Sequence, residues 1–251
     1  MVVGYPQPGK ARSRLVLEAF AVGACGTVLP DATALQAGPA AFYGLVGLEW
    51  MLRLCVAEGR TFFIGDNAHF DRSRGRYFRF ARNAWQVSTL QSPDHARAKA
   101  LGLEVKPWRR DGKHIVVVEQ SEHFLGMVGA RYWLPRVLRE LRPFTDREIR
   151  VRPWRRDKDK AGSTLQSDLK NAWALVTHMS AAANEALLAG VPVFVSGPCA
   201  ATPMASGPLS GIECPRYPEG REDWAAGLAN SQWTLSELRE GMAWRALSER
   251  A

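Results

Sequence analysis

Residues 174–197 (ALVTHMSAAANEALLAGVPVFVSG) carry the side chains with the clearest chemical potential in this chain of 251 residues. The pattern predicts a buried strand, a turn with Thr177, His178 and Ser180, a helix with Glu185, and a second strand. Ligands of parallel sheets bind beyond the carboxyl ends of the strands, and the free N–H groups of a helix start attract phosphate. The segment therefore suits a phosphorylated ligand with hydroxyl groups. An ordinary strand–helix–strand unit with a helix cap is the alternative.

A carboxylate follows another predicted strand, at residues 61–64. Asp66 comes just after this strand, where an α/β sheet commonly places catalytic groups. A carboxylate in that place can take a proton from a hydroxyl as a general base, and His69 could orient it. An Asx-turn formed by Asp66 and Asn67 is the simpler interpretation, and the two are compatible.

Residues 70–85 interleave arginines with aromatic side chains. Cations bind phosphates, and flat apolar rings stack on bases, so this segment is the best nucleic-acid signal in the chain. A solvated basic loop whose aromatic rings pack into the core is the alternative. The predicted nucleic-acid-binding residues are Arg72, Arg74, Arg76, Tyr77, Arg79 and Arg82.

Charge and composition narrow the class of protein. The net charge is +8, and it divides as +6 for residues 1–109, +5 for 110–160 and −3 for 161–251. Four cysteines stand singly, without the spacing of a zinc site, which favours a reduced cytoplasmic protein without a metal. We see no apolar run of the roughly 20 residues that a membrane span needs. The P-loop and G-x-S-x-G motifs are absent, which counts against P-loop kinases and α/β-hydrolases.

Alternating helix and strand patterns predict an α/β fold with mostly parallel sheets. Residues 31–44 are expected to be a loop and 68–110 to be irregular, and the linker candidate at 107–112 divides the chain. We therefore expect two Rossmann-like halves facing a cleft, residues 1–109 and 110–251. The expected helices are 12–25, 46–58, 132–141, 165–172 and 180–189, and the expected strands are 61–64, 113–118, 148–152, 174–177 and 191–195.

The pattern T-x-x-S…E-A-L-x-x-G-x-P-V of residues 177–193 resembles the donor signature of GT-B glycosyltransferases. It is especially similar to that of capsule-polysaccharide and phage-encoded transferase-like proteins. Residues 150–155 (RVRPWR) resemble the strand end that faces the sugar-nucleotide phosphates there, with Trp154 in place of an expected histidine. The tail 221–244 resembles the phage group, with Thr234 or Ser236 capping its second helix. The E-x7-E pair of retaining enzymes is absent, so the stereochemical outcome stays open.

The resemblance implies a nucleotide-sugar co-substrate bound by the C-terminal half, with no tightly bound cofactor or metal. The acceptor then binds the N-terminal half. Asp66 is the expected base, and Glu122 or His123 is the alternative base if Asp66 does not have this role. We expect a cytoplasmic enzyme without integral membrane contact (in the host cytoplasm if phage-encoded), and hydroxymethylated pyrimidine in phage DNA as acceptor. A capsule or lipopolysaccharide intermediate is one alternative, and a non-catalytic nucleic-acid-binding protein on a degenerate scaffold is another. The implied donor-binding residues are Arg152, Arg155, Thr177, His178, Ser180 and Glu185.

Overall fold

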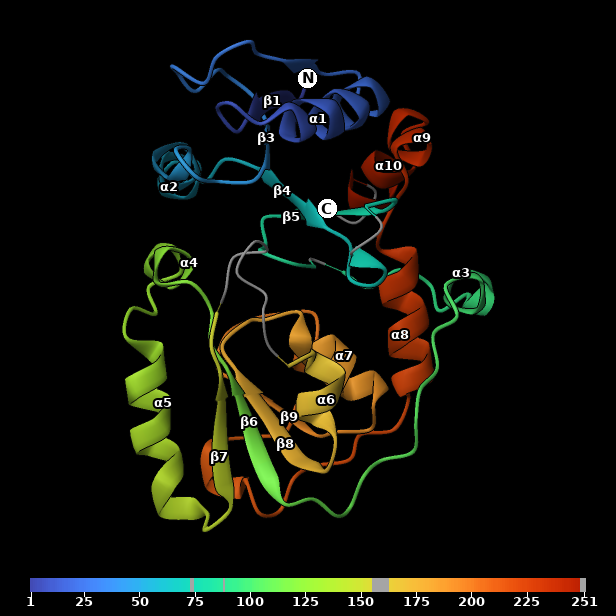
Figure 1. Cartoon of the computed structure of the whole chain (residues 1–251). Helices are drawn as coiled ribbons and strands as arrows, with labels where there is room; N and C mark the ends of the chain where they lie inside the picture. Colours follow the sequence, from blue (N-terminus) through green and yellow to red (C-terminus); the bar gives the residue numbers. More distant parts are fainter. Residues whose placement is uncertain (73–74, 88, 155–162, 249–251) are drawn as a thin grey trace. The chain divides into compact units, whose positions relative to one another are not determined.

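Two β-sheets with helices packed against them form the framework of the protein (Figure 1). The computed structural model describes residues 1–72, 75–87, 89–154 and 163–248. The chain divides into two units: unit 1 contains residues 1–101 and 226–251, and unit 2 contains residues 102–225. The predicted α/β class is confirmed, since each unit combines a mainly parallel sheet with helices.

Unit 1 contains a five-stranded sheet in the order β2-β1-β3-β4-β5, in which only β5 runs antiparallel to its neighbour. Helix α1 packs on one face of this sheet, where Phe20 stacks on Phe80 with ring centroids 4.1 Å apart. The elements of unit 1 are β1 (Val3–Pro6), α1 (Ala11–Gly23), β2 (Thr27–Val28), β3 (Ala40–Tyr43), α2 (Glu49–Ala57), β4 (Phe62–Asn67), β5 (Phe78–Arg82), α3 (His95–Ala100), α9 (Leu235–Arg239) and α10 (Met242–Ser248).

The C-terminal segment returns to the core of unit 1. Trp233 exchanges two backbone hydrogen bonds with Phe78 of β5, 2.7 and 2.8 Å long. Thr234 caps α9 in a capping box with Glu237, which confirms one of the two predicted caps. Leu238 and Leu247 then join the apolar cluster under α1. These helices therefore belong to unit 1, whereas the sequence analysis assigned them to the C-terminal half.

Unit 2 contains a four-stranded parallel sheet in the order β7-β6-β8-β9. Helix α5 covers one face with Trp133, Val137 and Leu141, while α6 and α7 lie on the other side (Figure 1). The elements are β6 (His114–Val118), α4 (Glu122–Met127), α5 (Trp133–Leu141), η2 (Arg142–Phe144), β7 (Glu148–Arg152), α6 (Leu165–Leu169), β8 (Ala172–Thr177), α7 (Ala182–Leu188), β9 (Val193–Val195), η4 (Thr202–Met204), η5 (Leu209–Gly211) and α8 (Arg221–Asn230), whose last residues belong to unit 1.

Each sheet has a point at which the strand order reverses. The chain runs from β1 to β2 on one side and then places β3 on the other side of β1. It runs likewise from β6 to β7 and then places β8 on the other side of β6. The crevice at the carboxyl ends of such a strand pair is the general ligand site of open α/β sheets. The fold therefore provides two candidate positions, one in each unit.

Candidate active site

Three strands of unit 2 end at one level, which brings predicted donor residues to a common edge. Val118 at the end of β6 pairs with Arg152 of β7 on one side and with Thr177 of β8 on the other. His178 and Ser180 follow Thr177 directly in the chain. The structure thus gathers these residues at the carboxyl edge of the sheet.

Two of these side chains already have partners within the unit. The Thr177 hydroxyl is fully buried and donates to the Val118 carbonyl at 3.0 Å. Arg152 forms an ion pair with Asp168 and donates to the Ser163 carbonyl at 2.9 Å. A guanidinium has five N–H donors, so Arg152 retains donors for an anion. Arg155, the other predicted donor-binding arginine, lies outside the described residues.

His178 belongs to a short chain of hydrogen bonds on the α5 face of the sheet. Its Nδ1 lies 2.9 Å from Oγ of Ser196, which also accepts from Nε1 of Trp133 at 2.7 Å. Burial lowers the pKa of His178, and the charge of Arg136 lowers it further. A β-carbon at Gly197 would lie only 2.7 Å from Cε1 of His178. Gly197 therefore leaves room for the imidazole. Because its pKa is lowered, the imidazole is neutral at pH 7.

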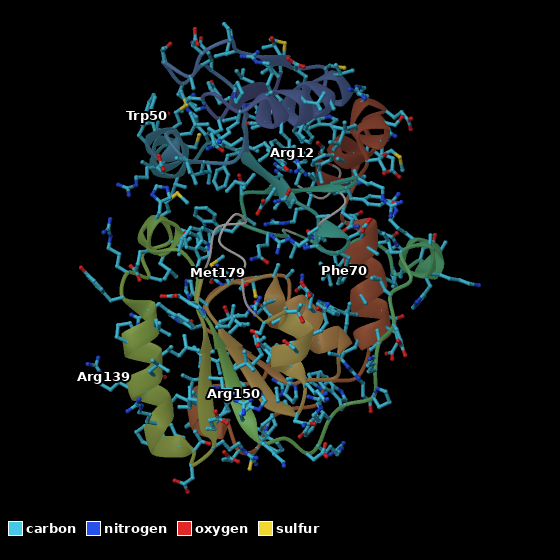
Figure 2. The ribbon with its side chains drawn as sticks, in the orientation of Figure 1. Arg12, Trp50, Phe70, Arg139, Arg150 and Met179 are labelled. Atoms are coloured by element: carbon cyan, nitrogen blue, oxygen red, sulfur yellow. The ribbon has the colours of Figure 1, made fainter. Side chains whose placement is uncertain are left out.

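The turn after β8 is fixed by two further side chains. The backbone N–H of Met179, labelled in Figure 2, donates to Oε1 of Gln120 at 2.7 Å. Oγ of Ser180 accepts from the N–H of Ala182 at the start of α7, at 3.2 Å. Glu185 is partly buried in the first turn of that helix. Gln120 was missed by the sequence analysis, although it lies two residues beyond a predicted strand.

A cavity of about 420 Å³ lies on the α5 side of unit 2. This volume falls within the range of pockets that hold small molecules, roughly 300–1,000 Å³. Ser196 lines the cavity, so the hydrogen-bonded chain from His178 ends in its wall. The remaining lining residues are Trp133, Arg136, Val137, Glu140, Val176, Phe194, Val195, Gly207, Pro208 and Leu209.

In unit 1, the predicted catalytic residue Asp66 lies on β4, directly opposite Arg79 of the antiparallel strand β5. Oδ2 of Asp66 accepts from Arg79 at 2.8 Å, and Oδ1 accepts from the N–H of Asn67 at 2.7 Å. Asp66 and Asn67 are strand residues paired with Arg79 and Phe78, so the expected Asx-turn after the strand is not formed. In an Asx-turn the carboxylate would accept from the residue two positions on, whereas this bond comes from the next residue. The side chain of Asp66 is nevertheless 47% exposed, so its carboxylate is accessible to solvent.

Tyr43 and Arg12 lie near Asp66 and Asn67, and the sequence analysis missed both. The Tyr43 hydroxyl donates to Oδ1 of Asn67 at 3.2 Å. Burial raises the pKa of Tyr43 to about 12, despite the opposing charge of Arg12. Arg12, labelled in Figure 2 at the start of α1, lies over the ring of Phe78 at 5.3 Å. No sequence motif marks these residues, because Tyr43 belongs to β3 and Arg12 to α1, and only folding brings them beside β4.

His69, the predicted partner of Asp66, is buried in the interior of unit 1. The hydrogen bonds of Asp66 within the described residues go to Arg79 and Asn67, and not to His69. Burial holds the pKa of His69 well below its usual value, and the charges of Arg79 and Arg72 act in the same direction. Its Nε2 has no hydrogen-bond partner among the described residues. The orienting group for Asp66 is therefore Arg79.

Three of the described arginines of residues 70–85 form hydrogen bonds to groups of unit 1. Arg79 is buried, Arg76 is bonded to Asp71 at 2.6 and 3.0 Å, and Arg82 donates to the Leu247 carbonyl at 3.4 Å. Arg72 is exposed, and Arg74 lies outside the described residues. The guanidinium carbons of Arg76 and Arg97 lie 5.9 and 5.7 Å from the Tyr77 ring centroid. The buried position of Arg79 differs from the surface position that the sequence analysis expected.

The described part of the chain contains neither a metal-binding cluster nor a membrane-spanning helix. Among these residues, no group of three or more His, Cys, Asp or Glu side chains has the arrangement of a metal site. Within the same part of the chain, no helix has the length and apolar character needed to cross a membrane.

The comparisons with known proteins concern the fold. No protein-family model matches the sequence, and no curated protein matches it. A solved structure of Thermosulfurimonas dismutans KpsC, a β-Kdo 2,7 transferase, is 12% identical with a TM-score of 0.57, and the match covers 98% of this chain and 99% of that one. A second, KpsC β-Kdo 2,4 transferase of the same organism, is 11% identical with a TM-score of 0.52, covering 90% and 89%. The chain therefore has a fold similar to that of these transferases over nearly its whole length.

Proposed function

We propose that the protein is a glycosyltransferase of GT-B-like organisation, with unit 2 as donor half and unit 1 as acceptor half. It would transfer a sugar from a nucleotide-sugar to a hydroxyl of a saccharide, of the kind found in capsule or lipopolysaccharide intermediates. The observation that carries this proposal is the similarity, over 98% of the chain, to a structure named as a Kdo transferase. The carboxyl-edge residues of both units supply chemistry suited to such a reaction.

The donor is proposed to bind at the carboxyl edge of the unit 2 sheet. Arg152, together with Arg155, would meet the phosphate groups, since a guanidinium matches phosphate oxygens in two-pronged contacts. Positive charge there would stabilise the departing nucleotide. Ser180 and the turn that Gln120 fixes would position the phosphates, while Glu185 would accept from ribose hydroxyls. Neutral His178 can donate or accept a hydrogen bond without adding charge.

Asp66 is proposed to receive the proton of the acceptor hydroxyl. Its carboxylate is exposed to solvent and is held by Arg79 and the Asn67 N–H. Two oxygens offer about four acceptor positions, so positions remain for a substrate hydroxyl. We propose no tightly bound metal or cofactor, because every step in this scheme can be supplied by side chains and the co-substrate.

A saccharide acceptor is favoured over DNA. Both similar structures are named as transferases of the sugar Kdo, and neither name refers to nucleic acid. Within the described residues, Arg76, Arg79 and Arg82 each donate a hydrogen bond to a group of unit 1. These contacts reduce the number of cations that a DNA backbone could meet. DNA with hydroxymethylated pyrimidine therefore enters the experiment as the competing acceptor.

The test begins with unfolding of the protein in the presence of CMP-, UDP-, GDP- and dTDP-linked sugars. A ligand present at 100 times its dissociation constant stabilises the folded state by about 2.7 kcal/mol. We expect one nucleotide class to stabilise the protein and the free sugars, used as controls, to have no effect. Turnover is then compared between a Kdo oligosaccharide and hydroxymethylcytosine DNA. Absence of stabilisation by every nucleotide-sugar would contradict the proposed function.

A further inference from the structure

Asp66 and Arg79 differ sharply in exposure although they are direct partners across two strands. The Arg79 side chain is 9% exposed, whereas that of Asp66 is 47% exposed. Directly opposite residues of an antiparallel pair project on the same face of the sheet. The guanidinium is therefore fixed in the interior, while the carboxylate that it binds is presented at the surface.

Arg79 makes three hydrogen bonds to two different segments of unit 1. One terminal nitrogen donates to the carbonyls of Trp85 and Gln86, at 2.9 and 3.0 Å, and the other donates to Asp66 at 2.8 Å. Burial lowers the pKa of Arg79, and the charge of Asp66 opposes that shift. Arginine nevertheless keeps its charge in proteins. The site therefore contains a buried cation whose charged partner is accessible to solvent.

A surface ion pair on α1 lacks this arrangement. Arg14 pairs with Glu18 along α1 at 3.9 Å, and their side chains are 41% and 52% exposed. Such a pair gives little rigidity, because both side chains remain free to move in water. In the Asp66–Arg79 pair, the carbonyls of Trp85 and Gln86 fix the guanidinium, which in turn fixes one carboxylate oxygen of Asp66. The second carboxylate oxygen is fixed in turn by the Asn67 N–H.

We propose that Arg79 is a positioning residue for the proposed reaction, which holds the Asp66 carboxylate in one orientation toward the acceptor. This inference rests on the proposed function, in which Asp66 takes the acceptor proton. Misplacement of a catalytic group by about 1 Å can cost roughly a hundredfold in rate. Arg79 acts through Asp66, and not on the substrate, so its loss lowers kcat more than it changes the acceptor KM.

The experiment compares Arg79→Lys, Arg79→Gln, Asp66→Asn and the double variant Asp66→Asn with Arg79→Gln. Turnover is measured with the nucleotide-sugar selected above and a Kdo oligosaccharide. We expect Arg79→Gln to lower kcat about a hundredfold and Arg79→Lys about tenfold, because Lys keeps the charge without the planar fork. The acceptor KM should change less than threefold. Arg14→Gln is the matched control, and its kcat should equal that of the wild type.

The double variant separates positioning from a general structural role. If Arg79 acts through Asp66, the double variant is no slower than Asp66→Asn alone. Additive losses would overturn the proposal. Arg79→Lys retains the buried charge, so it keeps the test decisive if Arg79→Gln does not fold, and wild-type kcat in a folded Arg79→Lys protein would also overturn it.

The outcomes distinguish this proposal from the proposed function. Inactive Asp66→Asn with fully active Arg79 variants would overturn the positioning role and leave the proposed function standing. Full activity of Asp66→Asn would overturn the assignment of Asp66 as base, and the role of Arg79 with it. Absence of turnover with every donor would overturn the proposed function itself.

Discussion

The hydroxyl of Thr177 donates to the carbonyl of Val118 at 3.0 Å, across the two strands between which the unit 2 sheet reverses its order. This bond uses the hydroxyl of a residue that the donor pattern predicts to contact the nucleotide-sugar. Thr177 then acts on a ligand only through the backbone turn that it anchors. Its side chain can therefore affect binding only by stabilising the carboxyl edge of the unit 2 sheet.

Thr177→Val should therefore destabilise the fold while leaving nucleotide-sugar affinity unchanged. The substitution keeps the shape and leaves the Val118 carbonyl without its donor, which costs about 1–3 kcal/mol. Thr177→Ser retains the hydroxyl and serves as the control. Urea unfolding and calorimetric titration measure the two quantities. A loss of affinity without a loss of stability would show that the hydroxyl contacts the ligand directly.

His69 should make the stability of unit 1 depend on pH. Burial and two arginines lower its pKa in the folded state, whereas an unfolded histidine titrates near 6.5. Below about pH 6.5 the unfolded chain thus binds a proton that the folded protein does not bind. Stability from this group is lost as the pH falls, by up to about 1.4 kcal/mol per pH unit, and is unaffected above that pH.

The His69→Asn variant isolates that contribution. Urea unfolding of both proteins at pH 7.5, 6.0 and 5.0 should show a steeper loss of stability in the wild type. All other titrating groups are shared, so the difference between the two curves reports His69 alone. Parallel curves would mean that His69 accepts a proton in the folded state.

Glu185 should contribute directly to donor binding. It lies partly buried in the first turn of α7, at the end of the sheet that carries His178 and Ser180. Glu185→Gln removes the charge from its hydrogen bonds, so nucleotide-sugar binding should weaken by on the order of 1–3 kcal/mol. Glu219→Gln, an exposed residue of the same unit, is the matched control. Equal donor affinity for Glu185→Gln and wild type in calorimetry would remove Glu185 from the site.

Asp66→Asn should lower turnover by roughly 10²–10⁴ if Asp66 is the general base. The amide oxygen can still accept from Arg79, so the loss of stability should be smaller than in Asp66→Ala, which leaves the buried guanidinium without its charged partner. Donor affinity should be unchanged in both variants. Initial rates and urea unfolding give the two comparisons. Turnover near that of wild type would transfer the role of base to Glu122 or His123.

The elements with strong apolar periodicity could be predicted from the sequence, and those set by pairing could not. Strands β6, β7 and β8 lie within a residue or two of their expected bounds, because each is a continuous or alternating apolar run. Strand β3 (Ala40–Tyr43) lies in a segment expected to be a loop. Its four buried residues are too few to show a period. Strand β5 (Phe78–Arg82) lies in the segment expected to be irregular, because its arginines conceal a buried strand.

The residues of the candidate sites also divide into those that a local sequence pattern could predict and those that only strand pairing brings together. Thr177, His178 and Ser180 are adjacent in the sequence and follow a recognisable strand, so their common location was predictable. The pairing of Asp66 with Arg79 joins residues 13 positions apart through strand register. The alternating pattern of FRFAR places Arg79 on the face opposite Phe78 and Phe80, so the pattern contains no signal that this side chain is buried. The return of residues 226–251 to unit 1 depends on packing against α1, which no local pattern expresses.

DNA binding should be weak and insensitive to the arginines of the segment after β4. In the structure, Arg72 is exposed, whereas Arg76 is bonded to Asp71 and Arg79 is buried. A duplex would release condensed counterions at each phosphate contact, so the logarithm of affinity would fall by about 0.9 per contact with the logarithm of salt. A saccharide transferase should instead bind DNA only non-specifically, with dissociation constants on the order of 10⁻⁴–10⁻⁶ M at physiological salt.

The measurement is a salt titration of binding to hydroxymethylcytosine duplex and to an unmodified duplex, for the wild type and for Arg72→Ala with Arg76→Ala. We expect equal affinity for the two duplexes and unchanged turnover of the double variant on a Kdo oligosaccharide. Arg14→Ala with Arg53→Ala removes two positive charges from exposed positions elsewhere in unit 1, so it controls for the change in overall charge. Tight binding of the modified duplex, with a slope that the double variant reduces by up to about two units, would replace the saccharide acceptor with DNA. That result would leave the proposed donor half unaffected, because all the proposed donor-binding residues belong to unit 2.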